Sequence, residues 1–386
     1  MEKICLLKRF NYLCKGKGIS RFSNKKAKNM ATRKVTIKDI ANEAGVSIAL
    51  VSFVMNNRAC GQINYRVNKE TSQRILEIAD KLNYQPNNAA RTLRSGKTNT
   101  IGVIVSDISN KFFADIARCI EDRAYKHKYT VLFGSTDENP QKLENLIEVF
   151  RNKGIDGLIV VPCEGSEEII RNVARQNIPL VLLDRGVEGT ELSSVVLDNR
   201  RAGLQITTAL LKQGFTRIHM ISYAMSLSNI RQREEGYKAC MTRAGLSDHI
   251  HIYHLRHDRL GWMDKVIRDE KEHGVEALVF ATNTLATAGL TAMLRNGWQI
   301  PQDFAMACFD SNEAFDLYNT AVAYVRQPIE RFGTEALDLL MKAIAQKESG
   351  TGPESCTRIV LTPEIAGYGV PEKKAAPAKQ ETEKSL

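Results

Sequence analysis

Decisive for the fold is the stretch Val35-Thr-Ile-Lys-Asp-Ile-Ala-Asn-Glu-Ala-Gly-Val-Ser-Ile-Ala-Leu-Val-Ser-Phe-Val-Met-Asn-Asn57, which predicts two short amphipathic helices joined by a tight turn. Thr36 can cap the first helix, and Gly45 supplies the positive φ that a helix end needs. Helical spacing places three apolar residues on one face of this helix: Ile40, Ala41 and Ala44. The stretch therefore predicts a helical hairpin with an apolar inner face.

The second helix begins after Ser47, which is a good capping residue. Helical spacing turns three valines toward the first helix: Val46, Val51 and Val54. It points four other residues outward, where no core covers them: Ile48, Ala49, Ser52 and Phe53. Exposed apolar residues on a short helix indicate a partner, and such a helix pair fits a DNA major groove. The alternative is an ordinary helical hairpin that packs on its own domain.

The sequence that follows carries a specific resemblance. The chain resembles the lactose/galactose repressor (LacI/GalR) family of bacterial transcription regulators in the run Leu82-Asn-Tyr-Gln-Pro-Asn-Asn-Ala-Ala-Arg-Thr-Leu-Arg-Ser-Gly-Lys97 and in Ile101-Gly-Val-Ile-Val after it. The resemblance extends from about Val35 to Gly369, with a longer loop near residues 58–68. It implies a helix-turn-helix headpiece, a hinge helix and a sensor that resembles periplasmic sugar-binding proteins.

The net charge of +10 is unevenly distributed along the 386 residues. Residues 1–30 carry nine Lys or Arg and one acidic residue, and residues 31–97 carry eleven Lys or Arg and five acidic residues. The rest of the chain carries thirty-four Lys or Arg and thirty-eight acidic residues, so it is slightly acidic. Because basic side chains that neutralise phosphates release condensed counterions, this asymmetry indicates a polyanion-binding head on an acidic body.

Cysteine content and apolar runs also indicate where in the cell the protein is located. Eight scattered cysteines, with no pair at zinc-finger spacing, indicate reduced thiols of a cytosolic protein: Cys5, Cys14, Cys60, Cys119, Cys163, Cys240, Cys308 and Cys356. No apolar run approaches the ~18 residues of a membrane span. The run Ile4–Leu7 is too short for the core of a signal peptide. We expect a cytoplasmic protein with no membrane contact and no cofactor.

The two ends of the chain differ from its body. Because Met30 lies just before the predicted headpiece, residues 1–30 are expected to be a disordered extension or an over-extended translation start. A basic arm that follows the DNA backbone is the alternative. Residues 370–386 are rich in Lys, Glu, Ala and Pro and are expected to be disordered. They lack the leucine heptads of tetrameric family members, so the resemblance implies a homodimer.

After Lys97, short β-branched runs alternate with helical stretches, which predicts an α/β fold with doubly wound parallel sheets. Examples of the helices are 113–127 and 200–212. The predicted strands are Ile101–Val105, Thr130–Phe133, Gly157–Val161, Leu180–Leu183, Ser194–Leu197, Arg217–Ile221, His249–His254, Ala277–Ala281 and Phe304–Phe309.

Nine strands are many for one doubly wound sheet, and the resemblance implies two subdomains with three chain crossings. We expect the crossings near Leu197, Gln327 and Thr351. The expected division is a headpiece at 31–85, a hinge helix at 86–97 and a sensor at 98–369. Within the sensor, the N-subdomain takes 98–197 and 328–351, and the C-subdomain takes 198–327 and 352–369. A small ligand would bind in the cleft between the two sheets.

The resemblance assigns base contact in the major groove to Ile48, Ala49 and Phe53. Relatives often carry polar or Arg side chains there, whereas these residues offer methyl groups and a ring. Apolar side chains can pack on thymine methyl groups, so we expect half-sites rich in A·T. Phosphate contacts are expected from short donors near helix ends and from basic residues of the longer loop: Ser47, Ser52, Asn56, Arg58, Arg66 and Thr71. Their alternative roles are helix caps and solvated charges.

Residues 87–94 resemble the hinge helix of the family, with Leu93 at the position that enters the minor groove. The small Ala90 would let two hinge helices approach closely. A helix of about eight residues is marginal in water, so we expect it to fold only when paired on double-stranded operator DNA.

Polar residues at expected strand ends match the positions where the family binds its effector: Asp107, Asn110, Phe112, Asp184, Arg185, Arg233, Asn283 and Asp310. Carboxylates, guanidinium groups and carboxamides suit the hydroxyls of a carbohydrate effector. The alternative for each is an ordinary surface or interdomain hydrogen bond. Three residues depart from the family pattern, namely Lys111, Thr284 and Arg256. The added cations raise the alternative of an acidic or phosphorylated effector.

The run His249-Ile-His-Ile-Tyr-His-Leu-Arg-His257 invites a test for a metal site. It lacks an accompanying Cys or carboxylate set, and His251 and His254 would lie on opposite strand faces, so no metal site is expected.

Three functions compete on this sequence. A dimeric, sugar-responsive DNA-binding regulator, most plausibly a repressor, accounts for the head and the sensor together. A solute-binding protein of sugar transport would share the sensor but would need an export signal and no basic head. An enzyme on a doubly wound fold would need a phosphate-binding loop, a nucleophile elbow or a metal-ligand cluster, and the sequence offers no such motif and no catalytic residues.

Overall fold

The computed structural model describes residues 35–60, 67–84, 96–310, 315, 322–351 and 356–367, with the backbone alone for 56–60. The chain divides into two compact units, Met1–Ala89 and Ala90–Leu386. The predictions for residues 1–30, for most of the hinge helix 86–97 and for the tail 370–386 lie outside the described residues. Among the described residues, no helix is long and apolar enough to cross a bilayer.

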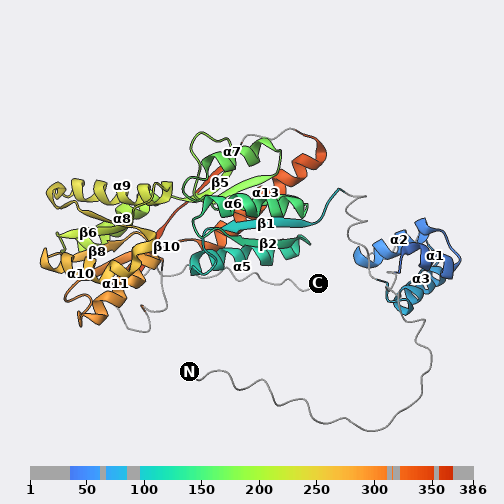
Figure 1. The fold of residues 1–386 in the computed structure, drawn as a ribbon, viewed down its shortest axis with the longest axis horizontal. Coiled ribbons are helices and arrows are strands. Elements are labelled where there is room, and N and C mark those ends of the chain that lie inside the picture. The colour runs from blue at the N-terminus through green and yellow to red at the C-terminus, as the bar shows by residue number, and fades with distance from the viewer. Residues whose placement is uncertain are drawn as a thin grey trace, which may run out of the picture. The chain divides into compact units, whose positions relative to one another are not determined.

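The first unit is a small helical domain made of α1 (Ile37–Ala44), α2 (Ile48–Cys60) and α3 (Lys69–Lys81) (Figure 1). The Asp39 carboxylate accepts hydrogen bonds from the backbone N–H and the hydroxyl of Thr36, which fixes the start of α1. Gly45 ends α1 with a φ of 64°. The predicted inner faces meet in one buried cluster with α3: Ile40, Ala41, Ala44, Val51, Val54, Ile75 and Ala79. The predicted hairpin is confirmed, and α3 completes its core.

The second unit, which we call the sensor, alternates strands and helices. Its elements are β1 (Thr100–Val105), α5 (Lys111–Lys126), β2 (Thr130–Ser135), α6 (Pro140–Asn152), β3 (Gly157–Val160), α7 (Glu167–Arg175), β4 (Leu180–Asp184), β5 (Ser193–Leu197), α8 (Asn199–Lys212), β6 (Ile218–Tyr223), α9 (Ser228–Arg243), η1 (Ser247–His249), β7 (Ile252–Leu255), η2 (His257–Trp262), α10 (Met263–Glu272), β8 (Ala277–Phe280), α11 (Asn283–Arg295), β9 (Ala305–Phe309), β10 (Val322–Arg326), α13 (Ile329–Ser349), β11 (Arg358–Leu361) and β12 (Glu364–Gly367).

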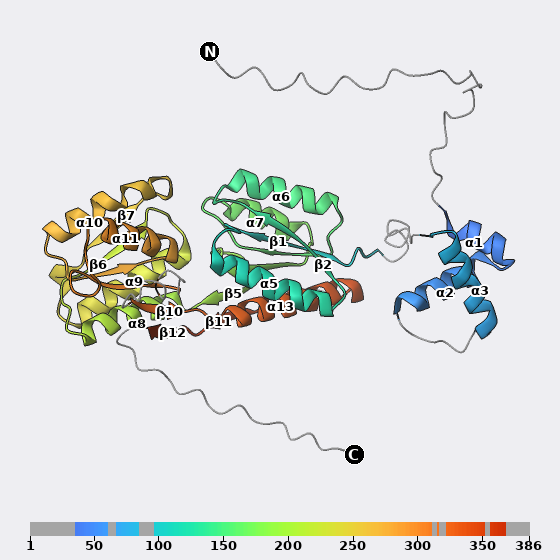
Figure 2. The same ribbon diagram turned by 90° about the horizontal axis from the view of Figure 1, so that it is seen from below.

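The strands form two sheets, which define two lobes. The first lobe contains the parallel sheet β11-β5-β4-β3-β1-β2, with α5 and α13 on one face and α6 and α7 on the other (Figure 2). The second lobe contains the sheet β12-β10-β9-β8-β6-β7, in which only β12 among the described strands is antiparallel to its neighbour. Helices α8 and α9 cover one face, and α10 and α11 cover the other. The predicted α/β class is confirmed.

Parallel strands buried on both faces account for these sheets. Their central strands carry continuous β-branched and apolar runs, such as Ile101–Val105 and Leu180–Leu183, which are buried throughout. In such a sheet the chain leaves each strand at the same edge. The carboxyl ends of both sheets therefore carry the loops in which a ligand site is expected.

Two strand predictions need correction. The strand predicted at His249–His254 starts later, as β7, because Ser247–His249 form a turn of 3-10 helix. The third crossing was expected near Thr351, which put residues 352–361 in the second lobe. Instead β11 pairs in parallel with β5, so it belongs to the first lobe, and the chain crosses between Leu361 and Glu364.

Candidate functional site

The site lies where the two lobes meet, at the carboxyl ends of their strands. Asp184 ends β4 in the first lobe with a φ of 63°, and Asp310 follows β9 in the second lobe with a φ of 65°. Asp tolerates this left-handed conformation better than most residues because its short polar side chain can bond locally. Strained backbone at a strand end turns the following residue sharply, and such residues often cluster at binding sites.

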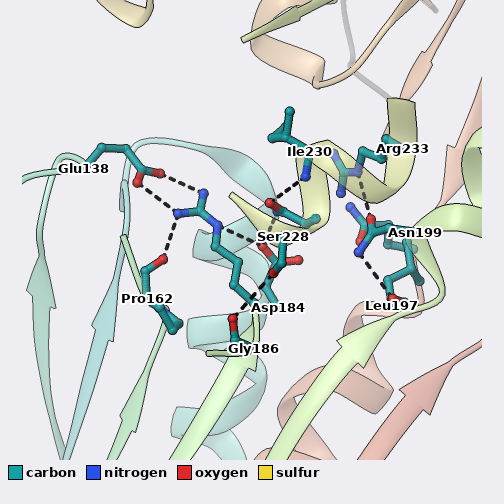
Figure 3. Close-up of polar contacts among 12 residues, drawn as sticks. Glu138, Pro162, Asp184, Gly186, Leu197, Asn199, Ser228, Ile230 and Arg233 are labelled. Atoms are coloured by element: carbon teal, nitrogen blue, oxygen red, sulfur yellow. Dashed lines mark hydrogen bonds and ion pairs between the residues drawn. The ribbon is translucent and has the colours of Figure 1, made fainter. Parts of the chain in front are cut away.

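Arg185 is held by the carboxylates of Glu138 and Asp184, which are labelled in Figure 3. Its Nη1 and Nη2 donate to the two carboxylate oxygens of Glu138 at 2.9 and 2.7 Å, and Nη1 also donates to the carbonyl of Pro162 at 2.9 Å. Its Nε lies 3.6 Å from Asp184. Burial lowers the pKa of Arg185, but the neighbouring Glu138 and Asp184 more than offset it and raise the pKa overall. The guanidinium is therefore fixed and charged.

Asp184 links the two lobes. Its Oδ2 accepts a hydrogen bond of 3.1 Å from the amide of Asn229, a residue of α9 in the second lobe. Its other oxygen, Oδ1, is buried and has no hydrogen-bond partner among the described residues. Burial raises the pKa of Asp184, and the positive charges of Arg185 and Arg233 oppose that shift. A buried oxygen without a donor is costly, so it indicates a place for a ligand or water.

Arg233 lies on the second-lobe side of the site. Its Nε donates to Asn199 Oδ1 at 2.8 Å, and its Nη1 donates to the carbonyl of Ala281 at 2.7 Å. The guanidinium carbon stands 3.9 Å from the centre of the Phe309 ring, a cation–π contact. Burial lowers the pKa of Arg233, and Asp184 and Asp310 oppose that change.

Asp310 faces Gln327, whose amide nitrogen donates to both carboxylate oxygens at 3.0 Å. Burial raises the pKa of Asp310 to about 7, although Arg233 and Gln327 favour the ionised form. Gln327 Oε1 is buried and has no hydrogen-bond partner in the described part of the chain. Both ends of this pair can therefore accept hydrogen bonds from a ligand.

A second group of predicted residues lines an open pocket of about 530 Å³ between the same two lobes. It contains Asp107, Asn110 and Asn283. Asn283 Nδ2 donates to Asn110 Oδ1 across the lobes at 3.1 Å, and the same oxygen accepts the backbone N–H of Phe112 at the start of α5. Asp107 accepts hydrogen bonds from the backbone N–H and hydroxyl of Ser109.

The structure thus divides the eight predicted effector residues into three sets. Asp184, Arg185, Arg233 and Asp310 form a buried polar network, while Asp107, Asn110 and Asn283 line the pocket. Phe112 does not join them, because its ring packs edge-on against Phe113 and Phe332 in the core of the first lobe.

Sequence reasoning missed the partners that hold this network, namely Glu138, Asn199, Asn229 and Gln327. Glu138 follows β2 with a φ of 57°, so a search of every strand end would have found it. Gln327 lies in the crossing after β10, and Asn199 is the first residue of α8, just past the crossing after β5. Their roles depend on contacts with residues 17 and 34 positions away.

The predicted DNA-contact residues in the first unit lie on and around α2. Ile48 is 51% exposed, Ala49 is exposed and Phe53 is half-buried. Ser47 Oγ accepts the backbone N–H of Leu50, which fits the capping alternative, and Ser52 and Thr71 are half-buried. The side chains of Asn56 and Arg58, together with Arg66, Ala90 and Leu93, lie outside the described residues.

Family models match both units. The model of bacterial regulatory proteins of the lacI family matches residues 36–87, and that of periplasmic binding proteins and the sugar-binding domain of the LacI family matches residues 98–360. The chain belongs to the LacI family. It is therefore a DNA-binding transcriptional regulator with an effector-binding domain, and the alternative of a transport component is set aside.

Individual LacI-family proteins agree with this assignment. Catabolite control protein A of Priestia megaterium is 30% identical over 313 residues, which cover 80% of this chain and 92% of that protein. The repressor PurR of Histophilus somni is 29% identical over 319 residues, which cover 81% of this chain and 93% of that protein. A LacI-family regulator from Silicibacter pomeroyi has a similar structure, with a TM-score of 0.68, 25% identity, and 86% and 98% of the two chains covered.

Proposed function

We propose that this regulator is a dimeric repressor whose affinity for an operator is set by a neutral, hydroxyl-rich effector, such as a sugar, bound between the lobes. The observation that carries this proposal is the pair of buried acceptors, Asp184 Oδ1 and Gln327 Oε1, which have no hydrogen-bond partner among the described residues. A ligand with several hydroxyls can donate to both acceptors at once. One of the relatives described above is named a repressor, which supports repression as the mode of regulation.

The charges around the site favour a neutral effector over an acidic one. Lys111, which raised the alternative of an acidic effector, pairs with Asp115 at 3.1 Å, and Arg256 pairs with Asp258 on the surface, with 72% of its side chain exposed. Arg185 is already bound by Glu138. A phosphate or carboxylate would have to compete with Asp115 or Asp258 for these two cations, whereas hydroxyls need only the unused acceptors.

In this proposal each charged residue has a defined role. Asp184 and Asp310 accept hydrogen bonds from effector hydroxyls, and Arg185 and Arg233 keep those carboxylates oriented while donating through their remaining N–H groups. Asn110 and Asn283 bond to each other across the lobes, and Asp107 lines the same pocket. An effector that binds both lobes favours the closed arrangement, because only that arrangement offers both sets of contacts.

DNA recognition is proposed to rest on α2, which presents the exposed Ile48 and Ala49 and the half-buried Phe53. Apolar groups there would discriminate through thymine methyl contacts, so selection from a random duplex pool should return half-sites rich in A·T. Uniformly G·C-rich half-sites would contradict this assignment. Phosphate contacts by Ser47, Ser52, Asn56, Arg58, Arg66 and Thr71 are proposed from the family resemblance.

The hinge proposal is that Leu93 enters the minor groove and that Ala90 lets two hinge helices meet. Leu93→Ala should weaken specific operator binding while it leaves salt-driven non-specific binding nearly unchanged. Equal losses in both kinds of binding would refute the role of Leu93. We also propose the headpiece 31–85, the hinge 86–97 and a cytoplasmic location, with no catalytic activity.

The main experiment measures how much of a random duplex pool the purified full chain retains, with and without each member of a panel of neutral and acidic sugars. Wild type should enrich one sequence, and a neutral sugar should change that enrichment. Asp310→Asn should keep the enrichment but lose most of the sugar response, because it removes an acceptor in the sensor and leaves the first unit intact.

The exposed substitution Asp122→Asn makes the same change of side chain outside the site and serves as the control. A protein that enriches no duplex under any condition would overturn the regulatory proposal. A response to acidic sugars only, or a sugar response that survives Asp310→Asn, would overturn the proposed effector site while leaving DNA binding intact.

A further inference from the structure

A cluster of two imidazoles and a carboxylate lies in the second lobe, away from the effector site. His219 is on β6, His251 directly precedes β7, and Glu270 is on α10. One ligand atom of each lies within 4.8 Å of the others. His219 stands at the amino end of its strand, whereas the effector residues lie at the carboxyl ends. We call these three residues the histidine–glutamate cluster.

The strand pairing places the two imidazoles side by side. Strands β6 and β7 are parallel, with Met220 opposite Ile252, so the preceding residues His219 and His251 are neighbours on the same sheet face. Their ring centres lie 4.7 Å apart. Because side chains alternate between faces along a strand, this placement follows from the register and persists as long as the sheet does.

The backbone around both histidines is held by Tyr237, which is fully buried. Its hydroxyl donates to the carbonyl of Ile218 at 2.7 Å, and it accepts the backbone N–H of His251 at 3.1 Å. A third bond, from Met220 N–H to the carbonyl of His251 at 3.0 Å, joins the two strands. The cluster is therefore built on rigid elements, as metal ligands require.

The ligand atoms are already turned toward one another. His219 Nδ1 lies 2.6 Å from Glu270 Oε2, and His251 Nε2 lies 4.0 Å from Glu270 Oε1. The Glu270 side chain is 5% exposed, while His219 is 18% and His251 is 54% exposed. The cluster thus has a buried carboxylate at its base and an opening to solvent beside His251.

We propose that the histidine–glutamate cluster binds a divalent transition-metal ion of the zinc class, with a water molecule as the remaining ligand. Zinc takes imidazole nitrogen and carboxylate oxygen at about 2.0–2.2 Å in a tetrahedral arrangement, which places neighbouring ligand atoms roughly 3.3–3.5 Å apart. The ion replaces the proton shared by His219 and Glu270, and rotation of the exposed His251 ring brings its Nε2 closer.

Such an ion joins three elements that otherwise meet only through packing and hydrogen bonds. It ties α10 to the β6–β7 edge of the second lobe. Because it binds the folded protein and not the unfolded chain, it raises the temperature of unfolding in proportion to the logarithm of its free concentration. This site is independent of the effector proposal, since it shares no residue with it.

The test uses the full chain and titrates Zn²⁺ against a chromophoric chelator, followed by thermal unfolding in the presence of Zn²⁺. Wild type should compete with the chelator and unfold at a higher temperature when Zn²⁺ is added. His251→Gln and His219→Gln should each weaken binding by about tenfold or more. The matched control is His249→Gln, which changes an exposed histidine near the cluster and should bind as wild type does.

Cobalt(II) distinguishes this site from the cysteines of the chain. Co²⁺ bound by the cluster should give visible d–d absorption without the near-ultraviolet band of a cobalt–thiolate bond, and His251→Gln should remove that absorption. Because His251 is exposed, this variant is expected to fold, and circular dichroism checks that it does. Absence of Zn²⁺ binding, equal loss in the His249 control, or a thiolate band on the bound ion would each overturn the proposal. In those cases His219 and Glu270 form a structural hydrogen bond only.

Discussion

Arg185 illustrates how single residues are fixed in the proposed effector site. Its guanidinium is bound by both oxygens of Glu138 and by a main-chain carbonyl, and its side chain is only 9% exposed. Removing one member of a buried ion pair leaves the other charge uncompensated, which costs far more than the loss of a surface pair. The chain offers both kinds of pair, so the difference can be measured.

Arg185→Met should lower the free energy of unfolding by about 3 kcal/mol, because Glu138 then keeps a largely buried carboxylate without its cation. The control is Arg118→Met, which removes an arginine that is 73% exposed and paired with Asp122. That change should cost no more than about 1 kcal/mol. Urea denaturation followed by circular dichroism measures both, and equal losses would contradict the burial argument.

Asp310 gives a prediction about pH. Its carboxyl has an ordinary pKa of 3.8 in the unfolded chain and a pKa of about 7 in the fold. The folded state therefore binds the proton more tightly, so this group stabilises the fold fully at low pH. That contribution is lost as the pH rises through the interval between the two values.

Asp310→Asn should consequently become more stable relative to wild type as the pH rises from about 4 to about 7. Thermal unfolding at several pH values measures this difference, with Asp122→Asn as the exposed control. A constant difference between Asp310→Asn and wild type across the interval would show that Asp310 is ionised throughout.

At this scale the sequence named Asp184, Arg185, Arg233 and Asp310 as candidate effector residues, and the structure brings them into one polar network; their role in binding stays a prediction, and their partners were not predicted. Asp184, Arg185 and Asp310 follow recognisable strands, so their position at the sheet edge could be inferred. Glu138 and Asn229 reach Arg185 and Asp184 from segments 47 and 45 residues away. Phe112 was expected to contact the effector, but its ring packs against Phe332 in the core, which its residue type and position did not reveal.

At the scale of elements, the closest packing in the sensor joins α8 and α9. A Cβ added at Gly236 would lie 2.2 Å from the carbonyl oxygen of Arg200 and 2.7 Å from the amide nitrogen of Leu204. A Cβ at Gly203 would lie 2.2 Å from the carbonyl oxygen of Arg233. These two glycines let the helices touch through their backbones, which brings Arg233 of α9 to Asn199 at the start of α8.

Gly236→Ala should destabilise the sensor by about 1–3 kcal/mol, because the atoms in its way belong to the backbone and cannot rotate aside. It should also reduce the effector response by displacing Arg233. For stability the control is Gly261→Ala, since a Cβ there meets no atom within 4 Å. Because Gly261 lines the pocket between the lobes, it is not a control for the sugar response. Thermal unfolding and the sugar-dependent DNA assay measure both effects, and a variant that matches the control would refute close helix contact.

The elements themselves were predictable where the sequence pattern is long. Central strands are continuous apolar runs, and helices α5 and α8 follow the predicted ranges closely. The sequence did not reveal β10, β11 and β12. Strands β11 and β12 have four residues each, and most of their side chains are exposed or half-exposed, so neither offers a long buried apolar run. Only pairing with distant strands identifies them, which is why the third crossing was misplaced.

At the scale of the whole sensor, the lobes are joined by direct hydrogen bonds as well as by the chain. Asp184 bonds to Asn229, Glu164 accepts the backbone N–H of Ser226 at 2.7 Å, and Asn110 bonds to Asn283. These contacts span the site on two sides and hold the lobes closed. A single charge placed among them should shift the balance toward an open arrangement.

Asn229→Asp should open the lobes, because it places a second carboxylate about 3.1 Å from that of Asp184. Small-angle X-ray scattering at a pH near 8 should show a larger radius of gyration for the variant, and a sugar effector should bind it more weakly. The control is Asn172→Asp, which makes the same change on the exposed surface of α7. Identical scattering from the two variants would argue against closure through Asp184 and Asn229.

Two of the three segments that cross between the lobes also supply partners for charged residues. Asn199 follows the crossing after β5 and binds Arg233, and Gln327 lies in the crossing after β10 and binds Asp310. A ligand that displaces Arg233 or Asp310 would therefore also displace the chain where it passes between the lobes. The same chain segments therefore connect the lobes and position the charged residues. A substitution that loosens these segments should also weaken effector binding.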